Sequence, residues 1–135
     1  MNTQELTIKT RQSFEAIELT PTLVSMVENA GIENGFLHVF VRHTTAAIVL
    51  NENADKGLVW RDLEELLDTF APADNSYHHS DGNGHAHLKA LLLGCEKTLL
   101  IQHRRLILGT WQGVFLIELD GPRERSVLVS ILKEC

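Results

Sequence analysis

The sequence predicts one α+β domain over residues 1–135, with a largely antiparallel or mixed sheet and two to three helices. A chain of 135 residues has the ordinary length of a single domain. Alternating apolar and polar residues, typical of strands, open and close the chain, and helical periodicity dominates its middle. Because strands and helices do not alternate strictly, this order favours an α+β fold over a parallel α/β fold.

The first thirty residues predict a β-hairpin followed by a short helix. Residues 3–10 and 14–19 alternate apolar and polar side chains on either side of a polar break. Thr20 is a residue type that caps helix N-termini, and Pro21 suits a first turn. Gly31 can adopt the left-handed conformation that ends a helix. We therefore expect a hairpin and then a helix that ends at Gly31.

The middle of the chain predicts two strands, an amphipathic helix and a long loop. Residues 35–41 and 45–50 are rich in β-branched and apolar side chains. Residues 53–70 place apolar side chains at helical spacing and acidic ones on other faces. Residues 71–84 are rich in Pro, Gly, Asp and Asn and are long enough to form a functional loop, which carries His78-His79.

The last third predicts a second helix and three closing strands. Residues 85–93 form a helical segment that ends before a glycine. Residues 98–102, 113–119 and 126–132 have the apolar and β-branched composition of strands. Internal repeats and low-complexity tails are absent from the sequence. The whole chain is therefore expected to form a single domain.

Composition and charge argue against several classes of function. The formal net charge is -6, and no run of Lys and Arg offers the clustered positive charge that nucleic-acid binding needs. No apolar run reaches the roughly 20 residues of a membrane span, and the first residues lack the pattern of a signal peptide. The two cysteines, Cys95 and Cys135, lack the spacing of a disulfide framework. We expect a cytoplasmic protein without nucleic-acid or membrane partners.

Histidines are the most conspicuous candidates for chemistry. Of seven in the chain, five lie at predicted strand ends, in the loop or at a helix start. Neutral imidazole is a common ligand of zinc-like ions, and three ligands leave a coordination position for water or substrate. His43, His79 and His87 could form such a set for a divalent metal such as zinc or magnesium. The alternative is that they are surface residues or hydrogen-bond partners of Glu52 and Asp55.

Polar residues lie at the junction of the predicted strand 45–50 and the predicted helix 53–70. Asn51, Glu52, Asn53 and Asp55 lie at this corner, where a helix start provides free backbone N–H groups. Such a corner suits a substrate anion near Asn51 and a catalytic carboxylate at Glu52. The alternative is a capping arrangement in which Asn51 or Asn53 caps the helix.

Trp111 and Gln112 lie between two glycines directly before a strongly apolar strand. Trp111 could stack on a flat ring that Gln112 hydrogen-bonds. The alternative is a hairpin turn whose tryptophan covers the core.

Arginines supply three candidate anion contacts. Arg123 and Arg125 lie in one turn and carry the forked guanidinium groups that grip phosphate or carboxylate. Arg42, next to a histidine, is the third. Alternatively, Arg123 or Arg125 pairs with Glu118 or Asp120 at a solvated hairpin tip.

Five short segments, in a fixed order and spacing, carry a resemblance to a known family. They are His43-Thr44-Thr45-Ala46-Ala47, Asn51-Glu52-Asn53-Ala54-Asp55, Tyr77-His78-His79, His87-Leu88-Lys89 and Gly109-Thr110-Trp111-Gln112-Gly113. Together they resemble the YjbQ family, of secondary thiamine-phosphate synthase type, over nearly the whole chain. The resemblance implies a mixed sheet curled into a partial barrel, assembly as a homotrimer, and histidines where His43, His79 and His87 stand.

The resemblance also implies an activity that joins a pyrimidine diphosphate to a thiazole phosphate. In this first hypothesis Trp111 and Gln112 hold the ring, Arg123 or Arg125 binds phosphate, and the histidines position a divalent metal or the leaving pyrophosphate.

Two further hypotheses use the same residues differently. In a zinc-dependent hydrolase, His43, His79 and His87 would bind the metal and Glu52 would be the general base for its bound water. In a non-catalytic module, the same pocket would bind a small phosphorylated metabolite without turnover. No sequence feature separates the three hypotheses.

Overall fold

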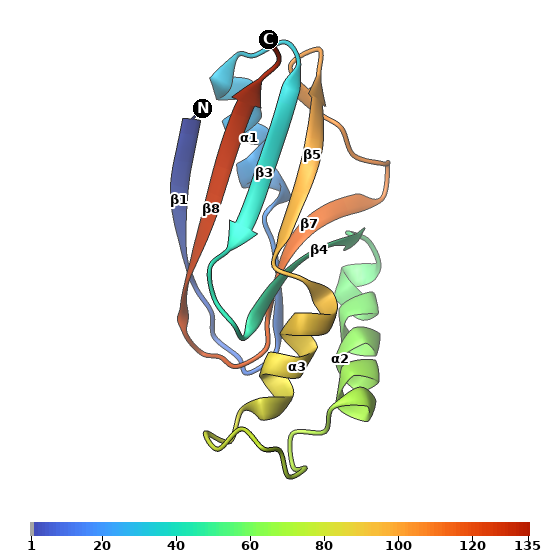
Figure 1. The fold of residues 1–135 in the computed structure, drawn as a ribbon. Coiled ribbons are helices and arrows are strands. Elements are labelled where there is room, and N and C mark those ends of the chain that lie inside the picture. Colours follow the sequence, from blue (N-terminus) through green and yellow to red (C-terminus); the bar gives the residue numbers. More distant parts are fainter. Residues whose placement is uncertain (1) are drawn as a thin grey trace.

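Two antiparallel sheets form the framework of the protein, as a computed structural model of residues 2–135 shows (Figure 1). The larger sheet has the strand order β1–β8–β3–β5–β6, and the smaller sheet has the order β2–β7–β4. The larger sheet consists of β1 (Asn2–Lys9), β8 (Glu124–Lys133), β3 (Gly35–Val41), β5 (Glu96–Gln102) and β6 (Arg105–Leu106). The smaller sheet consists of β2 (Glu15–Glu18), β7 (Gln112–Glu118) and β4 (Ala46–Glu52).

Three α-helices pack on these sheets, which confirms the predicted α+β class with a curled antiparallel sheet. Helix α1 (Thr20–Ala30) lies behind the larger sheet, and α2 (Leu58–Phe70) and α3 (Gly84–Leu93) lie side by side next to the smaller one (Figure 1). A short 3-10 helix, η1 (Asp55–Gly57), precedes α2. Among these described residues, no helix has both the length and the apolar character needed to cross a bilayer.

The predicted opening hairpin is wrong. β1 pairs with β8 in the larger sheet, whereas β2 pairs with β7 in the smaller one. The crossing between the sheets is fixed by Thr10, whose backbone N–H donates to the Arg123 carbonyl at 2.8 Å and whose hydroxyl donates to Glu118 at 2.7 Å. These long-range bonds hold the chain at the crossing and replace the local turn that the alternating pattern suggested.

Two helix starts also differ from the sequence prediction. Leu19, not Thr20, precedes α1, because the Thr20 hydroxyl accepts a hydrogen bond from the Val114 N–H of β7 instead. Neither Asn51 nor Asn53 caps α2, which begins only after Gly57. Lys56 and Gly57 have left-handed φ values of 54° and 81°, and these break the predicted 53–70 helix into η1 and α2.

Gly31 has the predicted left-handed conformation at the end of α1, with φ 65°. Strand β6 was not predicted, since two residues are too few for a detectable alternation.

The smaller sheet is buried on both faces, which explains the continuous apolar run of β7. Val114 and Leu116 face a core shared with α1 and the larger sheet. Phe115 and Ile117 face a second core under α2 and α3, where the Phe115 ring lies 4.4 Å from the ring of Trp60, centroid to centroid. A strand buried on both faces needs apolar side chains at successive positions rather than at alternate ones. The two cores therefore lock α2, α3 and the larger sheet to one central strand.

Candidate functional site

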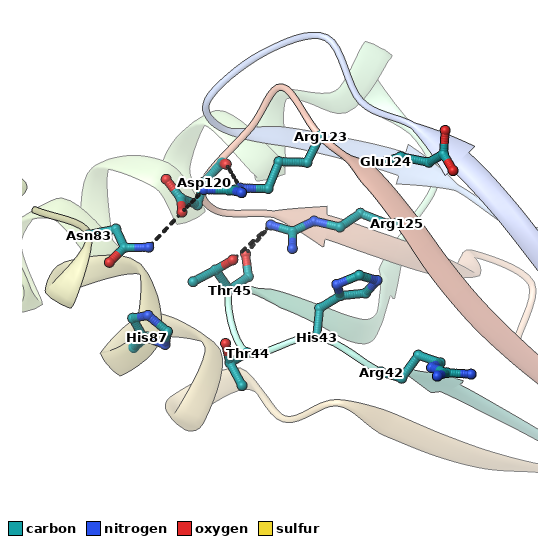
Figure 2. Close-up of a pocket in the computed structure, with 10 residues that line it drawn as sticks. All are labelled: Arg42, His43, Thr44, Thr45, Asn83, His87, Asp120, Arg123, Glu124 and Arg125. Atoms are coloured by element: carbon teal, nitrogen blue, oxygen red, sulfur yellow. Dashed lines mark hydrogen bonds and ion pairs between the residues drawn. The ribbon is translucent and has the colours of Figure 1, made fainter. Parts of the chain in front are cut away.

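A large cavity lies at one end of the two sheets, where three chain segments meet. The β3–β4 connection, the start of α3 and the β7–β8 turn enclose a volume of about 660 Å³ (Figure 2). We call it the arginine cavity. Its lining consists of Arg42, His43, Thr44, Thr45, Asn83, His87, Asp120, Arg123, Glu124 and Arg125.

A buried ion pair forms one wall of the arginine cavity. Glu118, at the end of β7, is 0% exposed, and Arg125, at the start of β8, is 2% exposed. The Arg125 Nε donates to Glu118 Oε1 at 2.8 Å, and its Nη2 donates to the other carboxylate oxygen. The same Nη2 also donates to the carbonyl and hydroxyl of Thr45, each at 2.9 Å (Figure 2). Arg125 is therefore a fixed group whose Nη1 edge is left for a ligand.

Glu118 accepts hydrogen bonds from three groups besides Arg125. The Thr10 hydroxyl donates to one oxygen, and the backbone N–H groups of Leu119 and Asp120 donate to the other, each at 3.0 Å. Burial alone would raise the pKa of Glu118, but the hydrogen bonds from Arg125, Thr10 and the Asp120 backbone and the charge of Arg125 hold that pKa below its usual value. The carboxylate is therefore ionised at neutral pH.

His43 is held by the backbone of β8. The Ser126 N–H donates to the Nε2 atom of His43 at 2.8 Å, so a neutral ring carries its proton on Nδ1. Burial, and then the positive charge of Arg125, lower the pKa of His43 below its ordinary value of 6.5. Both effects keep this ring uncharged at neutral pH, with an N–H donor on one side only.

His87, on α3, lines the same cavity as His43 (Figure 2), and His79 lies beside His87. The rings of His79 and His87 have their centroids 4.6 Å apart and are tilted by 44°. His79 belongs to the exposed loop before α3, where its Nδ1 atom accepts from the Asp81 N–H at 3.4 Å. The structure thus brings the predicted His79 and His87 together at the rim of the arginine cavity.

His85 turns away from this site. Its Nδ1 atom lies 3.0 Å from the buried Nζ of Lys89, which also donates to Asp68 of α2 at 2.7 Å. Burial and then the charge of Lys89 lower the pKa of His85. His85 therefore joins α3 to α2, whereas His87, two residues further along the helix, lines the cavity.

A hydrogen-bonded chain crosses the mouth of the arginine cavity. Asn83 Nδ2 donates to Asp120 Oδ2 at 2.8 Å, and Arg123 Nη2 donates to the same oxygen at 2.9 Å (Figure 2). The carboxylate fixes the orientation of the amide, so the buried oxygen of Asn83 is Oδ1, which has no partner within residues 2–135. An unpartnered acceptor at this position favours a ligand or water that donates a hydrogen bond.

Arg42 is the arginine of the cavity that is free of an ion pair within residues 2–135. The pairing of Arg123 with Asp120 and of Arg125 with Glu118, one of the predicted alternatives, is confirmed. Arg42 is exposed and is held through its backbone N–H, which donates to the Ser126 carbonyl at 3.2 Å. Arg42 therefore carries the guanidinium charge of the cavity that no ion pair within residues 2–135 neutralises, and Glu124 adds a carboxylate to the same lining.

A second, apolar hollow adjoins the arginine cavity. It has a volume of about 400 Å³, and we call it the apolar groove. It shares His43, Thr44 and His87 with the arginine cavity, and the rest of its lining consists of Ala46, Ala90, Leu91, Gly94 and Cys95.

The predicted metal ligands do not form a three-ligand set in this arrangement. Within residues 2–135, no three His, Cys, Asp or Glu side chains converge closely enough to hold a metal ion. His43 already uses Nε2 to accept from Ser126, whereas His79 and His87 lie in contact with each other. As they stand, the three rings do not fit a tri-histidine centre, and metal binding by them stays a prediction.

Four predicted site residues lie at the other end of the smaller sheet. Glu52 pairs with Gln112, and Asn51 is its neighbour, so both lie six or seven residues along β4 from Thr45. At about 3.3 Å per residue this is a separation of roughly 20 Å from the arginine cavity. Trp111 is 66% exposed there, and the Gln112 side chain folds back to accept from the Gly109 N–H at 2.8 Å. A single chain does not bring these four residues to the histidines.

The sequence analysis did not single out Thr44 or Asn83 as candidate contacts, although both line the cavity. It named Asp120 and Glu118 only as ion-pair partners of the arginines, whereas Asp120 also lines the cavity and Glu118 fixes its wall. The signal for Glu118 was an acidic residue at the end of the most apolar strand of the chain, a position at which an unpaired carboxylate is unfavourable. Asn83 lies in a glycine-rich turn and carried no comparable signal.

Comparison with known proteins gives a consistent result over the whole chain. The family model described as UPF0047 protein YjbQ-like matches residues 4–134. A UPF0047 protein of Methanothermobacter thermautotrophicus is 44% identical over 131 residues, which cover 96% of this chain and 90% of that protein. The UPF0047 protein YugU of Bacillus subtilis is 36% identical, with 94% of this chain and 96% of that protein covered.

Solved structures agree with the sequence comparison. A YbjQ-like protein of unknown function from Sulfolobus solfataricus superposes with a TM-score of 0.93 at 40% identity and covers 98% of this chain and 97% of its own. An uncharacterised conserved protein of the yjbq/upf0047 family from Clostridium acetobutylicum has a TM-score of 0.91 at 41% identity, with 96% and 99% covered. The matches in sequence and in fold span the same nearly complete length, and the chain belongs to the YjbQ-like UPF0047 family.

Proposed function

We propose that the protein is a small-molecule enzyme whose arginine cavity holds the phosphate group of its substrate. The observation that carries this proposal is the gathering of three arginines, two histidines and two threonines around one cavity of about 660 Å³. Guanidinium and hydroxyl donors suit phosphate oxygens, and a cavity of this size is typical of small-ligand sites.

The ion pairs of the cavity support phosphate binding rather than oppose it. Asp120 and Glu118 hold Arg123 and Arg125 through one edge of each guanidinium. The fork of five N–H donors leaves further donors on each group. Donors held in place lose little conformational freedom when a ligand binds, and Arg42 adds a charge that has no ion-pair partner within residues 2–135.

Proton transfer by histidine is the catalytic step that this geometry supports best. His43 is neutral at neutral pH and carries its proton on Nδ1, so it can donate a hydrogen bond to a substrate oxygen. His87 lines the same cavity, and its ring has no hydrogen-bond partner within residues 2–135, so it is the histidine that can accept or deliver a proton. The pair can therefore supply a hydrogen-bond donor and a proton-transfer group to one bound phosphate ester.

The joining of a pyrimidine diphosphate to a thiazole phosphate stays the reaction that the family resemblance implies. Clustered donors in the arginine cavity support the departure of pyrophosphate, because they stabilise the negative charge that develops on it. Trp111 and Gln112, predicted to hold the ring, would have to come from a neighbouring subunit. A zinc-dependent hydrolase with Glu52 as its base would likewise need Glu52 of a neighbouring subunit, because Glu52 of the same chain lies at the other end of β4.

Phosphate binding is tested by replacing the arginine that has no ion pair. Arg42→Gln should weaken the binding of inorganic phosphate about tenfold or more, since a charge-assisted hydrogen bond contributes roughly 1.5–3 kcal/mol. The measurement is titration calorimetry at low salt. Arg105→Gln is the matched control, because Arg105 is exposed and lies on β6, away from the cavity. Absence of phosphate binding in the parent, or an equal loss in both variants, would contradict the proposal.

A panel of phosphorylated substrates separates an enzyme from a binding module. Product formation that is lost in His87→Gln, with phosphate binding retained, would support the enzyme. Tight binding without any product would favour the non-catalytic binder of a phosphorylated metabolite.

We also propose that the chain assembles as a homotrimer, as the family resemblance implies. In the larger sheet Phe36 pairs with Leu100 on one side and Leu132 on the other, and all three side chains are exposed. No helix covers this face in the part of the chain that the structure describes (Figure 1). Light scattering should give three times the chain mass of 15.2 kDa. A single-chain mass at micromolar concentration would contradict the trimer.

Metal binding by His43, His79 and His87 is tested by element analysis of protein purified without chelator. Near-stoichiometric zinc or magnesium that is lost in His79→Ala and His87→Ala would support it. Zinc content that is unchanged in both variants would count against these ligands.

A further inference from the structure

The apolar groove continues the arginine cavity without a break in its lining. His43, Thr44 and His87 belong to both, so a molecule that fills the arginine cavity meets the groove at these three side chains. Beyond them the wall changes character, since Ala46, Ala90 and Leu91 provide carbon surface. We infer that the substrate is a phosphate monoester with a hydrocarbon body, whose phosphate lies in the arginine cavity and whose body lies in the apolar groove. This inference rests on the proposed function.

Several backbone groups of the groove wall are already hydrogen-bonded to other backbone groups. The Gly94 N–H donates to the Ala90 carbonyl at 2.9 Å, and the Gly94 carbonyl accepts from the Ile48 N–H at 3.1 Å. The Cys95 carbonyl accepts from the Val41 N–H at 2.9 Å. A sugar hydroxyl placed against these groups or against the carbon surface of Ala46, Ala90 and Leu91 would lose water without gaining a partner, which is unfavourable. A hydrocarbon chain has no hydrogen bonds to water to lose, and its transfer from water to the groove is favourable.

The two hollows also differ in charge, in the way that such a ligand requires. All the arginines of the site lie on the side of the arginine cavity, and no Lys, Arg, Asp or Glu side chain of residues 2–135 lines the groove. A phosphate monoester carries its charge at one end only, so its charged end is matched to the arginine cavity and its uncharged end to the groove. The volume of the groove, about 400 Å³, is within the range of small-ligand sites.

Cys95 provides a reporter at the far end of the groove. It is exposed and lines the groove, whereas the other cysteine, Cys135, is exposed at the chain end. A Cys135→Ser variant therefore leaves one thiol, whose rate of alkylation by iodoacetamide measures access to the groove. Inorganic phosphate fills only the arginine cavity, so it should leave that rate unchanged. A hydrocarbon body in the groove should slow it severalfold.

The experiment compares three probes on the Cys135→Ser protein: inorganic phosphate, propyl phosphate and glycerol 1-phosphate. Propyl phosphate and glycerol 1-phosphate have the same three-carbon body, but only glycerol 1-phosphate carries hydroxyl groups on it. We expect propyl phosphate to bind roughly tenfold more tightly than glycerol 1-phosphate, because the two hydroxyl groups of glycerol 1-phosphate would lose water in the groove without gaining hydrogen-bond partners. We also expect it alone to protect Cys95 from alkylation.

Leu91→Asn tests the groove itself, with Leu92→Asn as its matched control. Leu91 lines the groove and is 79% exposed, whereas its neighbour Leu92 is 59% exposed and does not line it. Both are surface positions on α3, so neither change should unfold the protein, and circular dichroism checks this. Leu91→Asn should reduce the preference for propyl phosphate to about threefold or less, and Leu92→Asn should preserve it.

The outcomes separate the inference from the proposed function. No binding of inorganic phosphate would overturn both. Phosphate binding without a preference for propyl phosphate, without protection of Cys95, or with equal effects of the two asparagine variants would overturn the hydrocarbon body and leave the phosphate site standing.

Discussion

Replacing Glu118 with glutamine is expected to lower the free energy of unfolding by about 3–5 kcal/mol, because it leaves the Arg125 guanidinium buried without a counter-charge. Both side chains are almost completely buried, and the carboxylate accepts from Arg125, Thr10 and two backbone N–H groups. Urea unfolding measures the change, and the midpoint of thermal unfolding should fall by roughly 10 °C or more.

The matched control for Glu118 is an exposed ion pair. Glu33 pairs with Arg104 at 3.3 Å, and both side chains are well exposed. Glu33→Gln should change the free energy of unfolding by less than about 1 kcal/mol. If Glu118→Gln were no more harmful than Glu33→Gln, the buried pair would not be a source of stability.

The same pair makes the stability depend on pH in a defined direction. The folded protein holds the pKa of Glu118 below its ordinary value of 4.5. A carboxyl whose pKa is lower in the folded state than in the unfolded state contributes stability above the unfolded value and loses it as pH falls through the folded one. The difference in stability between the parent and Glu118→Gln should therefore shrink as pH falls below about 4.5.

Gly121→Ala is expected to destabilise the protein by about 3 kcal/mol and to abolish tight phosphate binding. A Cβ at Gly121 would lie 2.2 Å from the Gln12 carbonyl oxygen and 2.8 Å from the Glu118 side chain. The neighbour at 2.2 Å is backbone, so the β7–β8 turn must move. Asp120 and Arg123 lie on that turn, and their displacement removes two groups of the arginine cavity.

Gly31→Ala is the control for Gly121→Ala. Gly31 has a left-handed φ of 65° but open space around its Cβ position, so alanine should be disfavoured there by only about 1 kcal/mol and should leave phosphate binding intact. Thermal unfolding and phosphate titration of both variants distinguish the two effects. Equal losses in the two variants would mean that the contact with Gln12 is not what restricts position 121.

Most strands and helices could be predicted from periodicity, but their partners could not. Alternation placed β1 and β2 within a residue or two, yet the hairpin between them was wrong because Thr10 bonds to a turn more than a hundred residues away. Contacts of this range leave no trace in a local pattern. The break at Lys56 was missed for a similar reason, since a non-glycine residue with positive φ has no signature in sequence.

About half of the candidate site could be predicted from the sequence. The spacing of the remaining residues along the predicted strands already showed that they could not belong to the same site. His43 and Glu52 lie on either side of one predicted strand, so they had to be at opposite ends of it. Arg125 falls in register with the buried residues Val127 and Val129, which indicates an inward position and hence a structural partner. Periodicity used in this way would have separated the buried Arg125 from the exposed Arg42 and Arg123. The convergence of His43 with His87 follows only from the packing of α3 on β4.

The hydrogen bond from Ser126 to His43 bears on how mutants of this family should be interpreted. Ser126 lies in β8, the strand that pairs with both β1 and β3, so the ring of His43 adds a hydrogen bond to the backbone of an interior strand of the larger sheet. Truncating His43 would remove a partner of that strand together with a cavity group, and its phenotype would mix misfolding with lost chemistry. His87 makes no such bond within residues 2–135 and is the histidine whose replacement reports on chemistry alone.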